Sequence, residues 1–362
     1  MGQADGDRQW MPRARSRPRD LIQLFRQMSV MLASGISLAQ VLDNATEWGE
    51  DPRFGQVMTE VRGQVLAGHR LSHAMRQFPR FFPNLAVAMV QVGEMNGQLV
   101  DAQGRLADWL ERDYELRRRV ASTLSYPLFA LGLTAVLTLI IFYTALPGFV
   151  QMFSDMDIEV PLPTRILIAI TALIRSPLAW AAFCGLAVVG ISSARAYLET
   201  PRGRMTLFRT LLRIPMLGRL LQSASLARFA AASEAMLGSG TGLLSVLRLS
   251  AEVCGNPLLA EDVDRLLQHV RLGGSLSEYM ATRPSLYPSV VVNLISSGEE
   301  AAMLAPMFGA ITHHYERDVE YLTQVLSSML EPLLMATLAL VVGFIVISIF
   351  LPMYGYIGKL AP

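Results

Sequence analysis

One long segment occurs twice in this chain, and the repeat constrains the fold more than any other feature of the sequence. When the chain is shifted by 205 positions, MLASGISLAQVL (31–42) aligns with MLGSGTGLLSVL (236–247), and VGEMNGQL (92–99) falls on the similar stretch SSGEEAAML (296–304). The register continues without a gap over about 120 residues, through pairs such as Pro52 and Pro257. A long segment that occurs twice indicates a duplicated domain rather than a solenoid of short units.

Three apolar segments are long enough to cross a membrane. A helix rises about 1.5 Å per residue, so about 20 apolar residues span the hydrocarbon core. The segments Pro127–Pro147, Pro177–Tyr197 and Pro332–Pro352 meet this length, and the first and third occupy equivalent places in the two repeats. Their terminal prolines predict helices that begin at Pro127 and Pro332 and stop at Pro147 and Pro352. The charged fraction of 17% is below the quarter that is usual in soluble domains, which also favours a membrane protein.

Arginines predict the orientation of these spans. Four precede the first span and five follow the second, whereas the 148–176 loop balances its two arginines with acidic residues and the C-terminal segment holds one cation, Lys359. By the positive-inside rule, the N-terminus and the segment after the second span are cytoplasmic, and the loop and the C-terminus lie outside. Each repeat is then a cytoplasmic domain followed by an outward span, and the second span returns the chain to the cytoplasm.

Periodicity predicts that both cytoplasmic halves are bundles of about six helices. In the first half, Gly35 is expected to stop one helix and Ser37 to cap the next. The fold class is therefore an all-α polytopic membrane protein with two repeated bundles and three transmembrane helices. The expected domains are a basic mobile tail (1–20), the first bundle (21–126), span one (127–147), an external loop (148–176), span two (177–197), the second bundle (198–331), span three (332–352) and an external tail (353–362).

The stretch VGEMNGQL is interpreted as a corner between two helices. Gly93 is expected to take a left-handed C-terminal cap, Asn96 to cap the following helix, and Glu94 to lie near the positive end of that helix. The alternative is that the Glu94 carboxylate binds a metal ion or contacts a partner. The second copy keeps Gly298 and Glu299, but Ala302 stands where the first copy has Gly97.

At this point the residues resemble a known family. The paired corners GEMNGQL and GEEAAML, the paired segments SGISL and SGTGL, the dipeptides at 126–127 and 331–332, and the LP endings at 146–147 and 351–352 are similar to those of the type II secretion system F and type IV pilus platform proteins, over residues 21–358. The resemblance implies a platform (scaffold) in the bacterial inner membrane that contacts a hexameric cytoplasmic ATPase, helps to assemble pilin or pseudopilin subunits, and works with other inner-membrane assembly proteins, as a homo-oligomer in the lipid bilayer.

Two family properties are not expected to transfer directly. Some relatives bind calcium in the first cytoplasmic domain, but the expected neighbours of Glu94, Gln40 and Gln98, are neutral, and calcium prefers several carboxylate or carbonyl oxygens. The family's longer segment before the first bundle is reduced to a basic tail of about 20 residues, so the ATPase contact at this end is expected to differ.

Other classes of function lack support in the sequence. We find no nucleotide-binding loop, nucleophile elbow or zinc signature, and no base-reading motif, so we expect neither an enzyme nor a nucleic-acid-binding protein. The pairs His69–His73 and His313–His314 have no third ligand and indicate solvated helix faces, so no metal or cofactor is expected. A transporter or channel component is the alternative function, although transporters usually keep ionisable residues within their spans.

Overall fold

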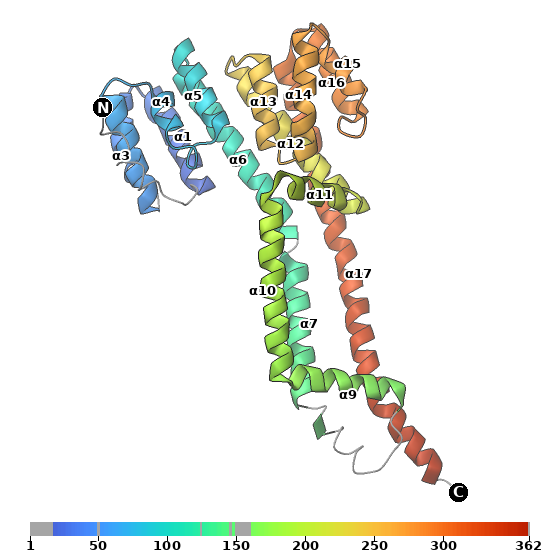
Figure 1. The fold of residues 1–362 in the computed structure, drawn as a ribbon. Coiled ribbons are helices and arrows are strands. Elements are labelled where there is room, and N and C mark those ends of the chain that lie inside the picture. The colour runs from blue at the N-terminus through green and yellow to red at the C-terminus, as the bar shows by residue number, and fades with distance from the viewer. Residues whose placement is uncertain (1–16, 49–50, 124, 145–146, 149–160, 361–362) are drawn as a thin grey trace. The chain divides into compact units, whose positions relative to one another are not determined.

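The computed structural model describes residues 17–48, 51–123, 125–144, 147–148 and 161–360, and every regular element in these ranges is an α-helix. The chain divides into two compact units (Figure 1). Unit 1 contains the chain up to Arg118 together with Leu211–Glu320, and unit 2 contains Arg119–Thr210 and the chain from Tyr321 onward.

Unit 1 is built from two series of helices. The first series is α1 (Pro18–Ala33), α2 (Leu38–Ala45), α3 (Pro52–Leu66), α4 (Leu71–Arg76), α5 (Asn84–Asn96) and the first part of α6 (Leu99–Thr123). The second series is α12 (Pro215–Gly238), α13 (Leu243–Val253), α14 (Pro257–Arg271), α15 (Leu276–Ala281), α16 (Ser289–Glu300) and the first part of α17 (Leu304–Leu360). The bounds of α3 and α14, and those of α4 and α15, differ by the same 205 positions at both ends.

Short-range signals explain where several helices begin and end. The Ser37 side chain accepts a hydrogen bond from the backbone N–H of Gln40 at the start of α2, and Gly35 takes a left-handed conformation (φ 82°) after α1. Both features were expected from the sequence. Asp51 and Asn256 cap α3 and α14 in the same way, and each is followed by a proline that has no N–H to satisfy.

One hydrophobic core joins the two series. Buried apolar residues of α1 to α6, among them Phe25, Phe54 and Leu106, form a continuous cluster with Ala232, Met236 and other residues of α12 and α13. A helix that buries several apolar side chains is stabilised mainly by this packing, because the intrinsic helix propensity contributes little by comparison. The two series therefore stabilise each other within unit 1.

Unit 2 contains α7 (Ser125–Thr144), α9 (Leu162–Arg175), α10 (Pro177–Glu199), most of α11 (Pro201–Leu212) and the second part of α17. Within the described part of the chain, two helices are long and apolar enough to cross a membrane: α10 over Trp180–Leu198, and α17 within Leu304–Leu351. The apolar helices Phe129–Thr144 and Leu162–Ile174 are shorter. Phe142 of α7, Leu167 of α9 and Ile345 of α17 form a small apolar cluster.

The structure corrects the expected roles of two of the terminal prolines, because α17 continues through both Pro332 and Pro352. The helix α7 is Ser125–Thr144, so Pro127 lies in its first turn and Pro147 follows its end. A proline inside a helix removes one backbone hydrogen bond, but membrane helices tolerate it because neighbouring groups satisfy the freed carbonyl. Pro332 and Pro352 are therefore not helix boundaries.

Three other expected boundaries differ as well. Residues 18–20 of the expected tail lie in α1, residues 353–360 of the expected external tail continue α17, and residues 162–175 of the expected loop form the helix α9. Residues 1–16, 149–160 and 361–362 of these segments lie outside the described residues.

Candidate functional site

The carboxylate of Glu94 binds the start of the short helix α4. Its Oε1 accepts a hydrogen bond from the backbone N–H of Leu71 (2.6 Å), and its Oε2 accepts from the N–H (3.3 Å) and the hydroxyl (2.5 Å) of Ser72. The residue before α4, Arg70, offers no side-chain cap. A carboxylate from α5 thus satisfies N–H groups that a helix leaves unpaired at its first turn, where the helix dipole favours negative charge.

Glu299 makes the same arrangement in the second series. It accepts from the N–H groups of Leu276 (2.6 Å) and Ser277 (3.0 Å) and from the hydroxyls of Ser275 (2.7 Å) and Ser277 (2.5 Å). Partial burial of this carboxyl disfavours its charge, but the hydroxyls of Ser275 and Ser277 and the two N–H donors outweigh burial and lower the pKa of Glu299 below its ordinary value. The ionised form is therefore the one that holds α15.

The expected role of Gly93 as a left-handed cap is wrong, because Gly93 lies inside α5. A Cβ at this position would lie 2.6 Å from the Cβ of Ala102, and a Cβ at Gly298 would lie 2.8 Å from the Cγ of Met307. Both glycines therefore allow a close approach between consecutive helices, α5 with α6 and α16 with α17, at the position beside each glutamate.

The left-handed cap belongs to Gly97 (φ 70°), which ends α5. Asn96 is the last residue of α5 and not the cap of α6, and Glu94 binds α4 rather than α6. In the second series Ala302 takes the left-handed conformation (φ 54°), and it is the one residue other than glycine that does so among the described residues. The backbone conformation is thus repeated although the residue type is not.

The surroundings of Glu94 do not fit a metal ion. Its oxygens face N–H and O–H donors, whose positive ends would repel a cation, and the Gln40 side chain accepts from Ser37 instead. No group of three or more His, Cys, Asp or Glu side chains gathers among the described residues. His69 and His73 lie with ring centroids 5.5 Å apart on an exposed surface, as the solvated-face interpretation expects.

An ion pair joins the two series of helices at α6 and α12. Arg228 donates to the Asp113 carboxylate at 2.6 Å, and the same carboxylate accepts from Arg117 at 2.7 Å. Arg228 also donates to the backbone carbonyls of Val253 and Cys254 at the end of α13. The side chains of Arg228 and Asp113 are 16% and 11% exposed, so this pair is largely shielded from water. The sequence does not indicate Arg228 as the partner of Asp113, because 115 positions separate the two residues.

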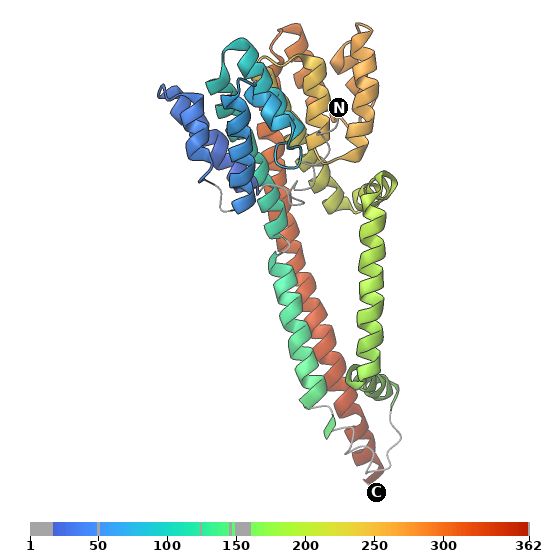
Figure 2. The same ribbon diagram turned by 60° about the vertical axis from the view of Figure 1, so that its left-hand side comes forward.

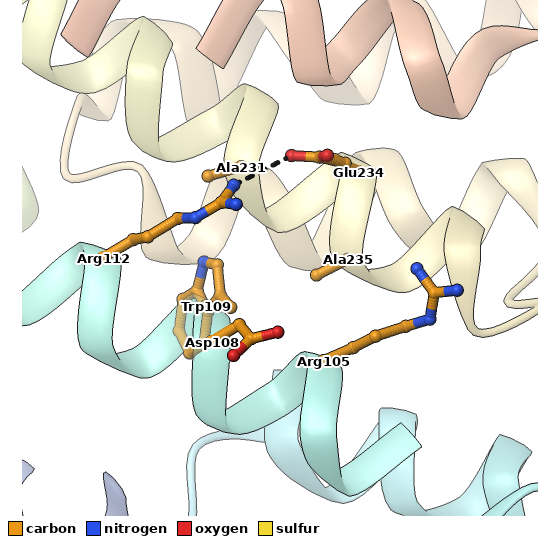
Figure 3. A pocket seen from close by; sticks show the side chains of 7 residues that line it. All are labelled: Arg105, Asp108, Trp109, Arg112, Ala231, Glu234 and Ala235. Atoms are coloured by element: carbon orange, nitrogen blue, oxygen red, sulfur yellow. Dashed lines mark hydrogen bonds and ion pairs between the residues drawn. The ribbon is translucent and has the colours of Figure 1, made fainter. Parts of the chain in front are cut away.

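A cavity of about 130 Å³ lies beside this ion pair, between α6 and α12 (Figure 3). Arg112 points across it and pairs with Glu234 at 3.3 Å, and the buried Trp109 ring forms part of the wall with no hydrogen-bond partner for its Nε1. The lining residues are Arg105, Asp108, Trp109, Arg112, Ala231, Glu234 and Ala235. The two arginines and the two carboxylates that line the cavity balance in charge, and its lining residues contain no arrangement of nucleophile and base.

The comparison with known proteins decides which family this architecture represents. The model of the family described as type II secretion system (T2SS), protein F, matches residues 24–147 and again residues 235–352, which together make up most of the chain. The chain belongs to this family. The resemblance expected from the sequence is therefore confirmed.

Individual relatives agree with this assignment. The chain is 32% identical to the type IV pilus assembly protein PilC of Thermus thermophilus, over 95% of this chain and 84% of the relative. It is 29% identical to the type II secretion system protein F of Pseudomonas aeruginosa, over 92% and 82% of the two chains, and 25% identical to PilC of the same species, over 93% and 90%. These names are consistent with a platform protein of these machines.

Proposed function

We propose that this protein is the inner-membrane platform of a type II secretion or type IV pilus machine, and that it couples a cytoplasmic ATPase to the assembly of pilin or pseudopilin subunits. The family and the names of its relatives support an assignment to these machines. The cavity and the ion pairs of unit 1 are docking and packing features, which suits a scaffold whose energy comes from a partner. Other inner-membrane assembly proteins and further copies of this chain are the expected neighbours.

We further propose that the chain is a duplicated unit with three spans. The 205-position shift between helix bounds and the two matches of the family model support the duplication. In this arrangement α7, α10 and the second part of α17 cross the membrane, unit 1 lies in the cytoplasm, and the C-terminus lies outside. The two similar halves then present related surfaces to the same compartment.

The proposed mechanism depends on the continuity of α17. This helix is unbroken over 57 residues, so the chain passes from the second series of unit 1 into unit 2 without a loop. In the first series, α6 ends at Thr123 and α7 begins at Ser125. A continuous helix can transmit a rigid-body shift, because no loop interrupts it.

Two insertions of equal length in α17 test this coupling. Four alanines inserted after Ser327 keep the helix and add close to one full turn, because an α-helix has 3.6 residues per turn, whereas four glycines at the same place destabilise the helix. We expect both variants to enter the membrane and to co-purify with the ATPase. The alanine variant should retain filament assembly or secretion, and the glycine variant should lose it.

Normal assembly by the glycine variant would contradict transmission through α17 and would make the protein a passive anchor. Solute flux through the purified protein in vesicles would instead favour the alternative of a transporter or channel component.

A further inference from the structure

The helix α9 buries two threonines, whereas several of its apolar residues are exposed. Thr164 and Thr171 are buried, whereas Leu162, Ile166, Ile170 and Leu173 are exposed by 73%, 50%, 37% and 64%. The four exposed residues recur at spacings of four, four and three positions, so they form one continuous stripe along the helix. A helix that faces water on its outer side has the opposite pattern, because exposed apolar stripes of this length are unfavourable there.

Specific hydrogen bonds hold α9 to its neighbours in unit 2. The hydroxyl of Thr164 donates to the backbone carbonyl of Ser348 in α17 at 2.6 Å. The carbonyl of Ile174 accepts two bonds, from the Tyr143 hydroxyl near the end of α7 (2.9 Å) and from Trp180 Nε1 near the start of α10 (2.6 Å). Figures 1 and 2 show α9 lying crosswise to α10, at the end of α10 where these contacts occur.

These contacts place α9 at the level where the neighbouring apolar helices end. The span candidate of α10 begins at Trp180, and the apolar part of α7 ends at Thr144, next to Tyr143. Tryptophan and tyrosine are enriched at the membrane–water interface, where the ring lies in an apolar layer and the polar group finds a partner. A helix of 14 residues is about 21 Å long, which is too short to cross the hydrocarbon core.

We propose that α9 is an interfacial helix whose apolar stripe, from Leu162 to Leu173, is covered by lipid of the outer leaflet. The exposed Arg165 extends its aliphatic stem along this surface and places its charge among the headgroups. The lipid surface on α9 is then continuous with that of α10, where Phe183, Leu186 and Val189 are also exposed and apolar. The inference rests on the proposed membrane topology, and it replaces the expected aqueous loop in residues 162–175 with a membrane-bound element.

Site-directed fluorescence of the full chain in phospholipid nanodiscs tests the proposal. Cys184 and Cys254 are replaced by alanine, and single cysteines are introduced at Ile166 or Leu173 in the stripe, at Val189 in the middle of α10, and at the exposed residue Arg53 of unit 1. Each cysteine carries an environment-sensitive fluorophore. Quenching is measured with lipids that carry the quencher near the headgroup, with lipids that carry it near the end of the acyl chain, and with iodide in water.

An interfacial helix is buried about 5–10 Å into the boundary of headgroups and acyl chains, so we expect the shallow lipid quencher to act about twofold more strongly than the deep one at Ile166 and Leu173. Val189 should show the reverse preference, and Arg53 should respond to iodide alone.

If Val189 is quenched by lipid while Ile166 and Leu173 behave like Arg53, the lipid contact of α9 is overturned and the proposed spans stand. If Val189 also responds to iodide alone, the membrane topology itself fails. Protection of the stripe from both lipid quenchers and iodide would indicate a protein partner and would also overturn the proposal.

Discussion

At the scale of single residues, Glu94 in the first series of helices and Glu299 in the second make the same contact within their own series. Each carboxylate leaves its own helix and binds N–H and hydroxyl donors at the start of a six-residue helix more than twenty positions earlier. Helices of this length are not stable alone, because nucleation requires several dihedral angles to be fixed for one hydrogen bond. The glutamates therefore stabilise α4 and α15 from outside, beside the glycines that permit close packing.

Gly97 and Ala302 should respond in opposite directions to the exchange of glycine and alanine. Both positions are left-handed, where a Cβ costs about 1–2 kcal/mol, and a Cβ at Gly97 would meet nothing within 4 Å. We expect Gly97→Ala to destabilise the chain by about 1 kcal/mol and Ala302→Gly to stabilise it by a similar amount. Denaturant unfolding of the full chain in detergent measures both. A loss of stability in Ala302→Gly would show that the backbone at this corner is not strained.

The Glu299→Gln variant should lose stability in a pH-dependent way. The folded state lowers the pKa of Glu299, so its ionised form contributes stability above the ordinary glutamate pKa of about 4.3 and loses this contribution as the pH falls through the lower folded value. Hydrogen bonds to a charged group are worth about 1.5–3 kcal/mol, so we expect a loss in this range at pH 7 and a smaller difference from wild type at acidic pH. Unfolding curves from pH 7 to below pH 4 measure it, with Glu300→Gln on the exposed face as the control. A difference that does not change with pH would contradict the charged interaction.

At the scale of helices, the boundaries of α17 and α9 differ from those expected from the sequence, because they depend on what surrounds each helix. Proline at 332 was expected to begin a helix, as it does in the first turn of α3 and α14, but α17 is helical on both sides of it. The apolar stretch of α9 is shorter than a membrane span. The sequence alone does not show which face of α9 is buried, because Thr164 is bound by a carbonyl of the distant helix α17. Element boundaries in a membrane protein thus depend on which groups satisfy the backbone and which surface surrounds the side chains.

Replacement of Pro332 by alanine should strengthen α17 rather than remove a helix start. The substitution restores the N–H that can donate to the carbonyl four residues earlier, in Ser328. In a soluble helix interior proline costs about 3 kcal/mol, and we expect a gain of about 1 kcal/mol here because nearby groups partly compensate in a membrane. Thermal melts followed by circular dichroism measure the change. Loss of stability in Pro332→Ala would support the original interpretation of this residue as a boundary.

At the scale of the whole chain, the two series of helices in unit 1 share a core and an ion pair rather than forming separate folding units. The buried cluster extends from Leu21 through Trp109 to Val246, and Arg228 links α6, α12 and the end of α13. Replacement of both partners of a buried ion pair by apolar residues often changes the stability little. Removal of one partner is strongly destabilising, because the other charge stays buried. Arg228 and Asp113 therefore favour one arrangement of the two series over others.

A double-mutant cycle should reveal this coupling. We expect Arg228→Gln and Asp113→Asn each to destabilise the chain by about 3 kcal/mol, because each removes one side of a largely shielded ion pair, and the double variant to lose less than the sum. Denaturant unfolding of the four proteins gives the coupling. The exposed pair Arg265 and Glu261 on α14 is a matched control that should show almost none. Additive losses at Arg228 and Asp113 would mean that the pair does not connect the two series.

The sequence by itself determined the features of this protein that arise from local or repeated patterns. The helical class, the family, the stop at Gly35 and the cap at Ser37 depend on residues within one turn, or on a register that repeats along the chain. These features can be predicted from the sequence because an amphipathic period and a capping residue act over a few positions.

Only the tertiary structure decided which distant groups meet. Glu94 was expected to lie near the start of the helix that follows it, but packing of α5 against α4 brings it to Leu71 instead. Gly93 permits the close approach of α5 to α6 rather than forming a turn. The sequence likewise did not indicate the partner of Asp113 or the buried face of α9. Hydrogen bonds and ion pairs between distant segments form where the hydrophobic core brings the helices together. The spacing of residues along the chain does not predict which helices meet in this way.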